Sequence, residues 1–187
     1  MQKFVQMKKT LKEFILPDTV TYLGDRAFKE TNIQKFTIPA NIVTWYSTSI
    51  VKIPYIFFNG LTPVFPYDIG TLRGTNYTHQ KYFVDEGALQ TYLNKFTHNS
   101  DPFYFYPKGE ITDDGFHVVR DTGNGYELVV YAGTGGDIKC GDLTVNGKQV
   151  YVTSVGKYAY YHVKEAFNIT FEDTVTQIND RAFYNSK

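Results

Sequence analysis

The sequence lacks three features that would point directly to a class of protein. Neither sign of charge dominates, because 19 basic side chains balance 19 acidic ones among 187 residues. No apolar run reaches the roughly 18 residues that a membrane-spanning helix needs. Cysteine occurs once, at Cys140, so no disulfide can form within the chain. These absences argue against a nucleic-acid partner, a membrane span and a disulfide framework.

Residues that carry chemistry are also few and scattered. The four histidines have neither the i, i+4 spacing of a metal site nor clustered carboxylate partners: His79, His98, His117 and His162. Asp113 and Asp114 lack the alternating oxygen ligands of a calcium loop and predict a solvated turn. Cys140 has no signature of a reactive thiol around it and is expected at a strand end. We therefore expect no catalytic residues, no metal site and no cofactor.

What the sequence does contain is an internal repeat. The run from Leu16 to Phe28 returns, without a gap, as the run from Phe171 to Phe183 at an offset of 155. Both copies carry Asp-Thr-Val-Thr and then Asp-Arg-Ala-Phe. A shift of 22 aligns residues 11–17 with residues 33–39, and a shift of 23 aligns residues 152–160 with residues 175–183. Self-similarity at this period predicts a solenoid of stacked coils.

Each repeat predicts one coil, made of a short strand that ends at a proline and a turn that buries an aromatic ring. A single coil cannot bury its apolar side chains, whereas stacked coils can. The side chains expected in the core are Leu11, Phe14, Leu16, Val20, Leu23, Phe28, Val155, Val175, Ile178 and Phe183.

Periodicity fails in the middle of the chain. Residues 59–78 predict a long loop, residues 81–84 a strand, and residues 87–96 a helix preceded by Asp85 as its N-cap. Farther along, residues 116–120 and 126–131 predict a hairpin, and residues 145–150 a second tight reversal. We expect three parts: N-terminal repeats over 1–58, a loop with a strand-helix cap over 59–109, and a hairpin followed by C-terminal repeats over 110–187.

The pattern from Leu11 to Phe28 resembles the BspA-type leucine-rich repeat, L-x-x-I-x-I-P-x-x-V-x-x-I-G-x-x-A-F. The units over residues 33–50 and 152–183 are similar to it, with Tyr160 in place of the phenylalanine of the first unit. The resemblance implies an α/β repeat solenoid, a right-handed coil of mainly short strands with short helical turns. It also implies an extracellular or cell-surface location and noncatalytic adhesion or binding to other proteins, which is known for some members of the family.

Positions between the core residues of such a coil point outward from the strands. We expect a protein partner to contact them on the strand face, at Glu13, Ile15, Lys35, Thr37, Asn168 and Thr170.

Aromatic residues make up 17% of the chain, with 16 tyrosines and 15 phenylalanines, and they leave two alternatives open. Alternate rings can fill the core while the others line the junction between the two arrays. Surplus tyrosines such as Tyr104 and Tyr106 can instead form an exposed patch, which would make the protein a glycan-binding module. At the other end of the chain, Phe183 lies in a coil without a polar cap. This predicts a longer chain, a partner that covers this end, or end-to-end self-association.

Overall fold

The computed structural model describes residues 12–50, 52–64, 80–96, 105–133, 135–163, 165 and 167–186. The chain forms two compact units, Met1–Pro107 and Lys108–Lys187. We expected residues 59–109 to form a separate part, but the structure places 59–107 in the first unit. The reason is that the strands of this segment join the sheet of the N-terminal repeats.

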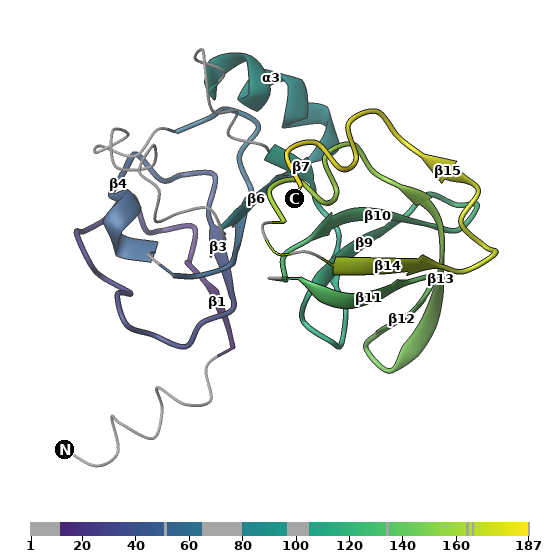
Figure 1. The fold of residues 1–187 in the computed structure, drawn as a ribbon. Helices are drawn as coiled ribbons and strands as arrows, with labels where there is room; N and C mark the ends of the chain where they lie inside the picture. The colour runs from purple at the N-terminus through teal and green to yellow at the C-terminus, as the bar shows by residue number, and fades with distance from the viewer. Residues whose placement is uncertain are drawn as a thin grey trace. The chain divides into compact units, whose positions relative to one another are not determined.

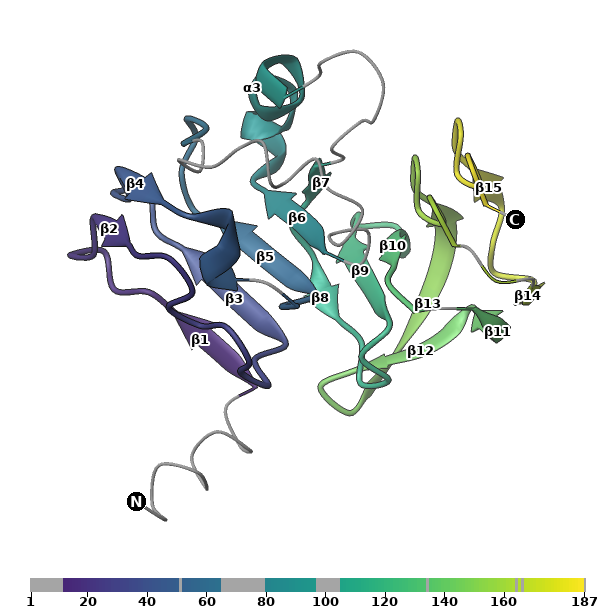
Figure 2. The same ribbon diagram turned by 60° about the vertical axis from the view of Figure 1, so that its left-hand side comes forward.

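The first unit is a stack of coils built on a five-stranded sheet. The strand order is β1-β3-β5-β6-β7, and every neighbouring pair is parallel (Figure 1). The strands are β1 (Glu13–Ile15), β3 (Lys35–Ile38), β5 (Tyr55–Phe58), β6 (Lys81–Val84) and β7 (Phe105–Pro107). The segments between them carry β2 (Tyr22–Leu23), β4 (Thr44–Trp45), the 3₁₀ turn η1 (Ser47–Ile50) and the helix α3 (Glu86–Phe96). Figure 2 shows β1, β3, β5 and β6 as a row.

The register of this sheet follows the sequence repeat. Glu13 lies opposite Lys35, and Tyr22 lies opposite Thr44, so both pairs keep the offset of 22. In the next coils the offset changes, because Tyr55 lies opposite Lys81. The segment between β5 and β6 is therefore longer than in the first coil, and the parallel pairing of the strands continues. The predicted strand over 81–84 and the predicted helix are both confirmed, whereas residues 65–79 of the predicted loop lie outside the described part of the chain.

Alternation along the strands separates a core face from an outward face. Phe36, Ile56 and Phe58 belong to one buried cluster together with Trp45 and Ile50 from the turn side of the coils. The rings of Phe14 and Phe28 pack against that of Phe36, with centroids 5.7 and 4.8 Å away. The core of the first unit thus combines aromatic rings with aliphatic side chains.

The second unit combines hairpins with two stacked coils. Its main sheet has the order β12-β13-β10-β9-β8, and β15 pairs with β13. A separate parallel pair joins β11 to β14, which run side by side in Figure 1. The strands are β8 (Glu110–Ile111), β9 (His117–Asp121), β10 (Tyr126–Tyr131), β11 (Gly136–Cys140), β12 (Asp142–Val145), β13 (Lys148–Val155), β14 (Phe167–Phe171) and β15 (Gln177–Ile178).

Both predicted reversals of the second unit are confirmed, as the antiparallel pairs β9-β10 and β12-β13. The offset of 23 is confirmed where Val155 lies opposite Ile178. With coils stacked in both units, the predicted repeat solenoid is confirmed.

The core predictions have mixed outcomes. Leu16, Leu23 and Val155 are buried. Four other predicted core residues are partly buried against the clusters: Phe14, Val20, Phe28 and Val175. Ile178 and Phe183 are 54% and 36% exposed, so they are not core residues. The cause is their place in the last described coil, where no described residue stacks beyond them. Leu11 lies outside the described residues.

Candidate functional site

The outward face of the first sheet is polar at its β1 end. Lys35 Nζ lies 2.8 Å from Glu13 Oε1, and the same ammonium lies 5.0 Å from the centroid of the Phe57 ring. Ile15 follows Glu13 on this face by two residues and is 60% exposed. Three of the predicted contact residues therefore share this face: the Glu13–Lys35 ion pair and the exposed side chain of Ile15.

Toward β7 the same face is an aromatic row. Phe57 stacks on Phe83 with centroids 4.7 Å apart, and Phe83 lies 5.9 Å from Tyr106. Tyr106 is only 3% exposed, so it does not offer the exposed ring that glycan binding requires. Thr37 was also expected to point into solvent, but it is 7% exposed, because it sits in register between Ile15 and the large ring of Phe57. Tyr104 lies outside the described residues.

Lys81 shares the outward face with these rings, opposite Tyr55 in the register. It is buried, and the loss of water around its ammonium lowers its pKa to about 8. The sequence predicted a strand here but gave no sign that this lysine would be buried.

The second strand face is the β11-β14 pair. Asn168 and Thr170, both predicted as contact residues, are exposed on β14. They lie opposite Asp137 and Lys139 of β11, and Asn168 Nδ2 donates to Asp137 Oδ1 at 3.0 Å. The sequence repeat did not identify the two β11 residues, because the β12-β13 hairpin lengthens this coil and sets the β11-β14 register at an offset of 31.

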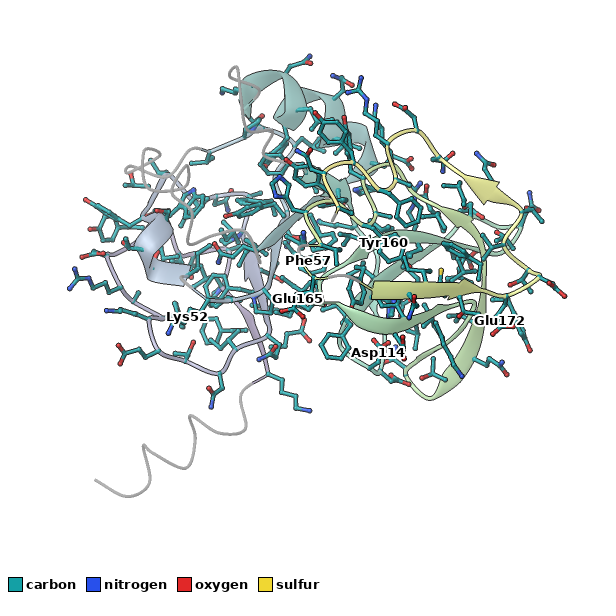
Figure 3. All side chains as sticks on the ribbon, in the orientation of Figure 1. Lys52, Phe57, Asp114, Tyr160, Glu165 and Glu172 are labelled. Atoms are coloured by element: carbon teal, nitrogen blue, oxygen red, sulfur yellow. The ribbon has the colours of Figure 1, made fainter. Side chains whose placement is uncertain are left out.

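A hollow of about 400 Å³ lies beside β11. Its wall comprises Asp114, Phe116, His117, Tyr131, Gly135, Asp137, Ile138, Lys139 and Leu143. Figure 3 shows Asp114 beside β11, on the side away from β14. The ring of Phe116 is 52% exposed, while His117 and Tyr131 are buried.

Asp114 organises the wall of this hollow. Its Oδ2 lies 2.8 Å from His117 Nδ1, and its Oδ1 accepts hydrogen bonds from the Thr112 hydroxyl and the Phe116 N–H. Burial by itself would raise the pKa of Asp114, but the hydrogen bonds from His117, Thr112 and Phe116 outweigh it and hold the pKa well below its ordinary range. The carboxylate is therefore ionised at neutral pH.

The expectation that His117 has no carboxylate partner is thus wrong. The spacing from Asp114 to His117 is three residues across a turn, which is the only sequence signal of the pair. Nδ1 is engaged by the carboxylate, whereas Nε2 is buried with no hydrogen-bond partner among the described residues. Burial also raises the pKa of the nearby Tyr131 hydroxyl, which donates to the Gly135 carbonyl at 3.4 Å.

Other chemistry is sparse in the part of the chain that the structure describes. No group of three His, Cys, Asp or Glu side chains in it could hold a metal ion. Cys140 is fully buried, and burial raises the pKa of its thiol to about 11. No helix among the described residues is long and apolar enough to cross a membrane.

Comparison with protein families identifies a repeat family in this chain. Six copies of the BspA type leucine-rich repeat region cover residues 2–56 and 140–187. These ranges contain β1, β3 and β14, and they leave out α3, the β9-β10 hairpin and all of β11 except Cys140. No curated protein and no solved structure matches the chain.

Proposed function

Because the chain belongs to the BspA-type leucine-rich repeat family, we propose that it is a noncatalytic protein that binds another protein through its outward strand residues. Repeat solenoids present extended surfaces of this kind, on which neighbouring coils supply neighbouring contact positions. Cell-surface adhesion, which the family resemblance implies, is part of this proposal.

The observation that supports it most directly is the setting of Ile15. This side chain is 60% exposed and belongs to the same face as the Glu13–Lys35 ion pair. An apolar anchor surrounded by polar groups is the usual arrangement at the centre of a protein interface. Exposed polar residues on β14, Asn168 and Thr170, extend the proposed contact set to the second unit.

The first test is a photo-crosslinking experiment on the full chain. A photoreactive amino acid replaces Ile15 in one version and Val43 in the other, and each is irradiated with extracts of the source cells and of cells to which they adhere. Val43 is the matched control, since it is an aliphatic residue of the same unit that is 70% exposed outside the strand row. We expect a protein adduct at position 15 that is absent at position 43. The same adducts at both positions would contradict the proposal.

The second test uses the captured partner. Ile15→Asp places a charge at the centre of the proposed interface and should weaken binding about tenfold or more, whereas Val43→Asp should leave binding unchanged. Surface location is tested separately by protease treatment of intact source cells. Digestion of the chain without lysis is expected, and complete protection would contradict adhesion.

A further inference from the structure

The edge of β11 that faces away from β14 has backbone groups available for pairing. In a parallel ladder, the N–H and C=O of one residue point to one neighbouring strand, and those of the next residue point to the other side. Cys140 lies opposite Phe171, and its carbonyl accepts from the Glu172 N–H at 3.1 Å. Cys140 and Ile138 therefore face β14, whereas Asp137 and Lys139 present their N–H and C=O groups to the opposite edge.

Nothing in the described part of the chain pairs with that edge. The sheet that contains β11 has two strands, and β14 is the other. The strand ahead of β11 in the sequence is β10, which pairs with β9 and β13 instead. In a regular solenoid, the strand of the preceding coil would pair with this edge of β11. Here β10 pairs within the β9-β10 hairpin and with β13, so among the described strands the edge of β11 has no such neighbour.

The hollow of about 400 Å³ occupies this vacant side. Its wall includes the consecutive residues Asp137, Ile138 and Lys139, as expected of a space that runs along the strand, and Asp114 and Phe116 line it as well. Five residues of β11 extend over about 17 Å, so the edge offers room for a short extended segment.

The wall also carries groups that select side chains. Asp114 is an ionised, partly buried carboxylate, and the half-exposed ring of Phe116 follows it by two residues. A carboxylate beside an aromatic face attracts a lysine or arginine side chain through charge and through the cation–π interaction. Lys139 adds one positive charge to the wall, against the two carboxylates of Asp114 and Asp137.

We propose that the free edge of β11 binds an extended segment of the partner protein as an added strand, with a basic side chain of that segment between Asp114 and Phe116. This inference rests on the proposed protein-binding function and deepens it, since it names the conformation and charge of what is bound. Strand addition obtains its affinity from backbone hydrogen bonds and its selectivity from side-chain pockets, and β11 with its hollow offers both.

The test removes a single backbone donor. In Lys139→Pro the N–H that points away from β14 is lost while the β11-β14 ladder keeps its bonds, which is the position where an edge strand tolerates proline. Lys139→Ala is the matched control, because it removes the same side chain and keeps the N–H. The probe is a displayed library of random linear dodecapeptides, selected on the full wild-type chain, and each enriched peptide is then titrated against both variants.

We expect enriched peptides that carry Lys or Arg and that bind Lys139→Pro about tenfold more weakly than Lys139→Ala, the effect of one lost backbone hydrogen bond. Phe116→Ala should weaken them too, without loss of folding, because that ring is half exposed. Amide hydrogen exchange at Asp137 and Lys139 should slow when peptide is bound. Equal binding to the two Lys139 variants, or no enrichment over the immobilisation surface, would overturn the proposal.

The outcome for strand addition is separable from that for the proposed function. If Ile15→Asp abolishes binding of the captured partner while Lys139→Pro does not, the protein-binding function stands and strand addition by that partner fails. If neither substitution affects partner binding, both proposals fail.

Discussion

The ring of Phe36 is fully buried and forms a cluster with those of Phe14 and Phe28, which also contact each other. Aromatic residues contribute large apolar areas, and their tilted or offset arrangements add to the stabilisation from burial. Phe28, which the sequence indicated as a core plug, closes this cluster from the turn side but is itself only partly buried. At the residue scale, stability therefore depends more on Phe36 than on Phe28.

Phe36→Ala should lower the free energy of unfolding by about 3–5 kcal/mol, the usual cost of removing a buried phenylalanine side chain. Phe28→Ala should cost less, about 2–3 kcal/mol, because that side chain retains contact with water in the folded state. Urea titrations followed by near-ultraviolet circular dichroism measure both. A larger loss for Phe28→Ala than for Phe36→Ala would contradict this ranking.

The Asp114 carboxylate makes the free energy of unfolding of the second unit depend on pH. Its pKa in the folded protein is lowered, so its contribution to stability is complete above the unfolded-state value of about 3.9 and is lost as pH falls below it. We expect wild-type stability to fall between about pH 4 and pH 2, and Asp114→Asn to fall less over the same interval.

Denaturant midpoints measured at pH 7, 4 and 3 check this expectation. Asp173→Asn is the control, since Asp173 is an exposed carboxylate of the same unit. The same acid dependence in the Asp114→Asn protein and the wild type would show that the carboxylate does not stabilise the fold.

At the scale of the elements, the β12-β13 hairpin shows how a local signal determines a structure. Asn146 and Gly147 both have positive φ, 52° and 74°, as a two-residue type I′ turn requires. Their N–H groups donate to the two oxygens of Asp113, each at 2.9 Å, so the turn is also tied to the loop after β8. The Asn-Gly pair predicted the reversal from sequence, but the tie to Asp113 has no such signal because the residues are more than 30 positions apart.

Gly147→Val should destabilise the protein by about 1–2 kcal/mol, because a β-branched residue is strained at positive φ. Gly87→Ala is the matched control in a helix: Gly87 lies in α3 with open space around it, and the substitution should stabilise by about 0.5–1 kcal/mol. Thermal unfolding of both variants measures the two effects. A neutral Gly147→Val would contradict the assigned turn.

Periodic features of the fold could be predicted, and features that depend on distant side chains could not. The offset of 22 correctly placed Phe14 beside Phe36, because apolar positions recur with the coil. The burial of Tyr106 could not be predicted, because it depends on contact with the ring of Phe83. The two rings belong to an aromatic row that is aligned by an offset of 26 between β5 and β6, and the sequence repeat does not contain this offset. The hollow beside β11 was missed for the same reason, since it depends on the position of the Asp114 turn relative to a strand that begins 22 residues later.

At the scale of the whole molecule, the division into two units predicts that a destabilising substitution in one unit leaves the stability of the other unchanged. Ile56 and Leu128 are both fully buried, one in each unit. Either residue replaced by alanine should cost about 2–5 kcal/mol. Because coils interact mainly with their neighbours, the loss should be confined to the unit that carries the substitution.

Hydrogen exchange measured by mass spectrometry on the full chain resolves this. Ile56→Ala should accelerate exchange in peptides from residues 1–107 and leave peptides from residues 108–187 unchanged, and Leu128→Ala should do the reverse. Acceleration of both halves by either substitution would show that the two units unfold as one.

The short strands of the first unit have a mechanical consequence. Only three residue pairs hold β1 in register with β3, and equivalent positions in the two coils are 22 residues apart. A force that pulls on the end of such a stack acts on one coil at a time, so each coil that yields should lengthen the chain by roughly 75 Å. A protein built in this way would lengthen under load in small increments and dissipate work at each one. Force spectroscopy would record this as a series of extensions, each set by the number of residues in one coil.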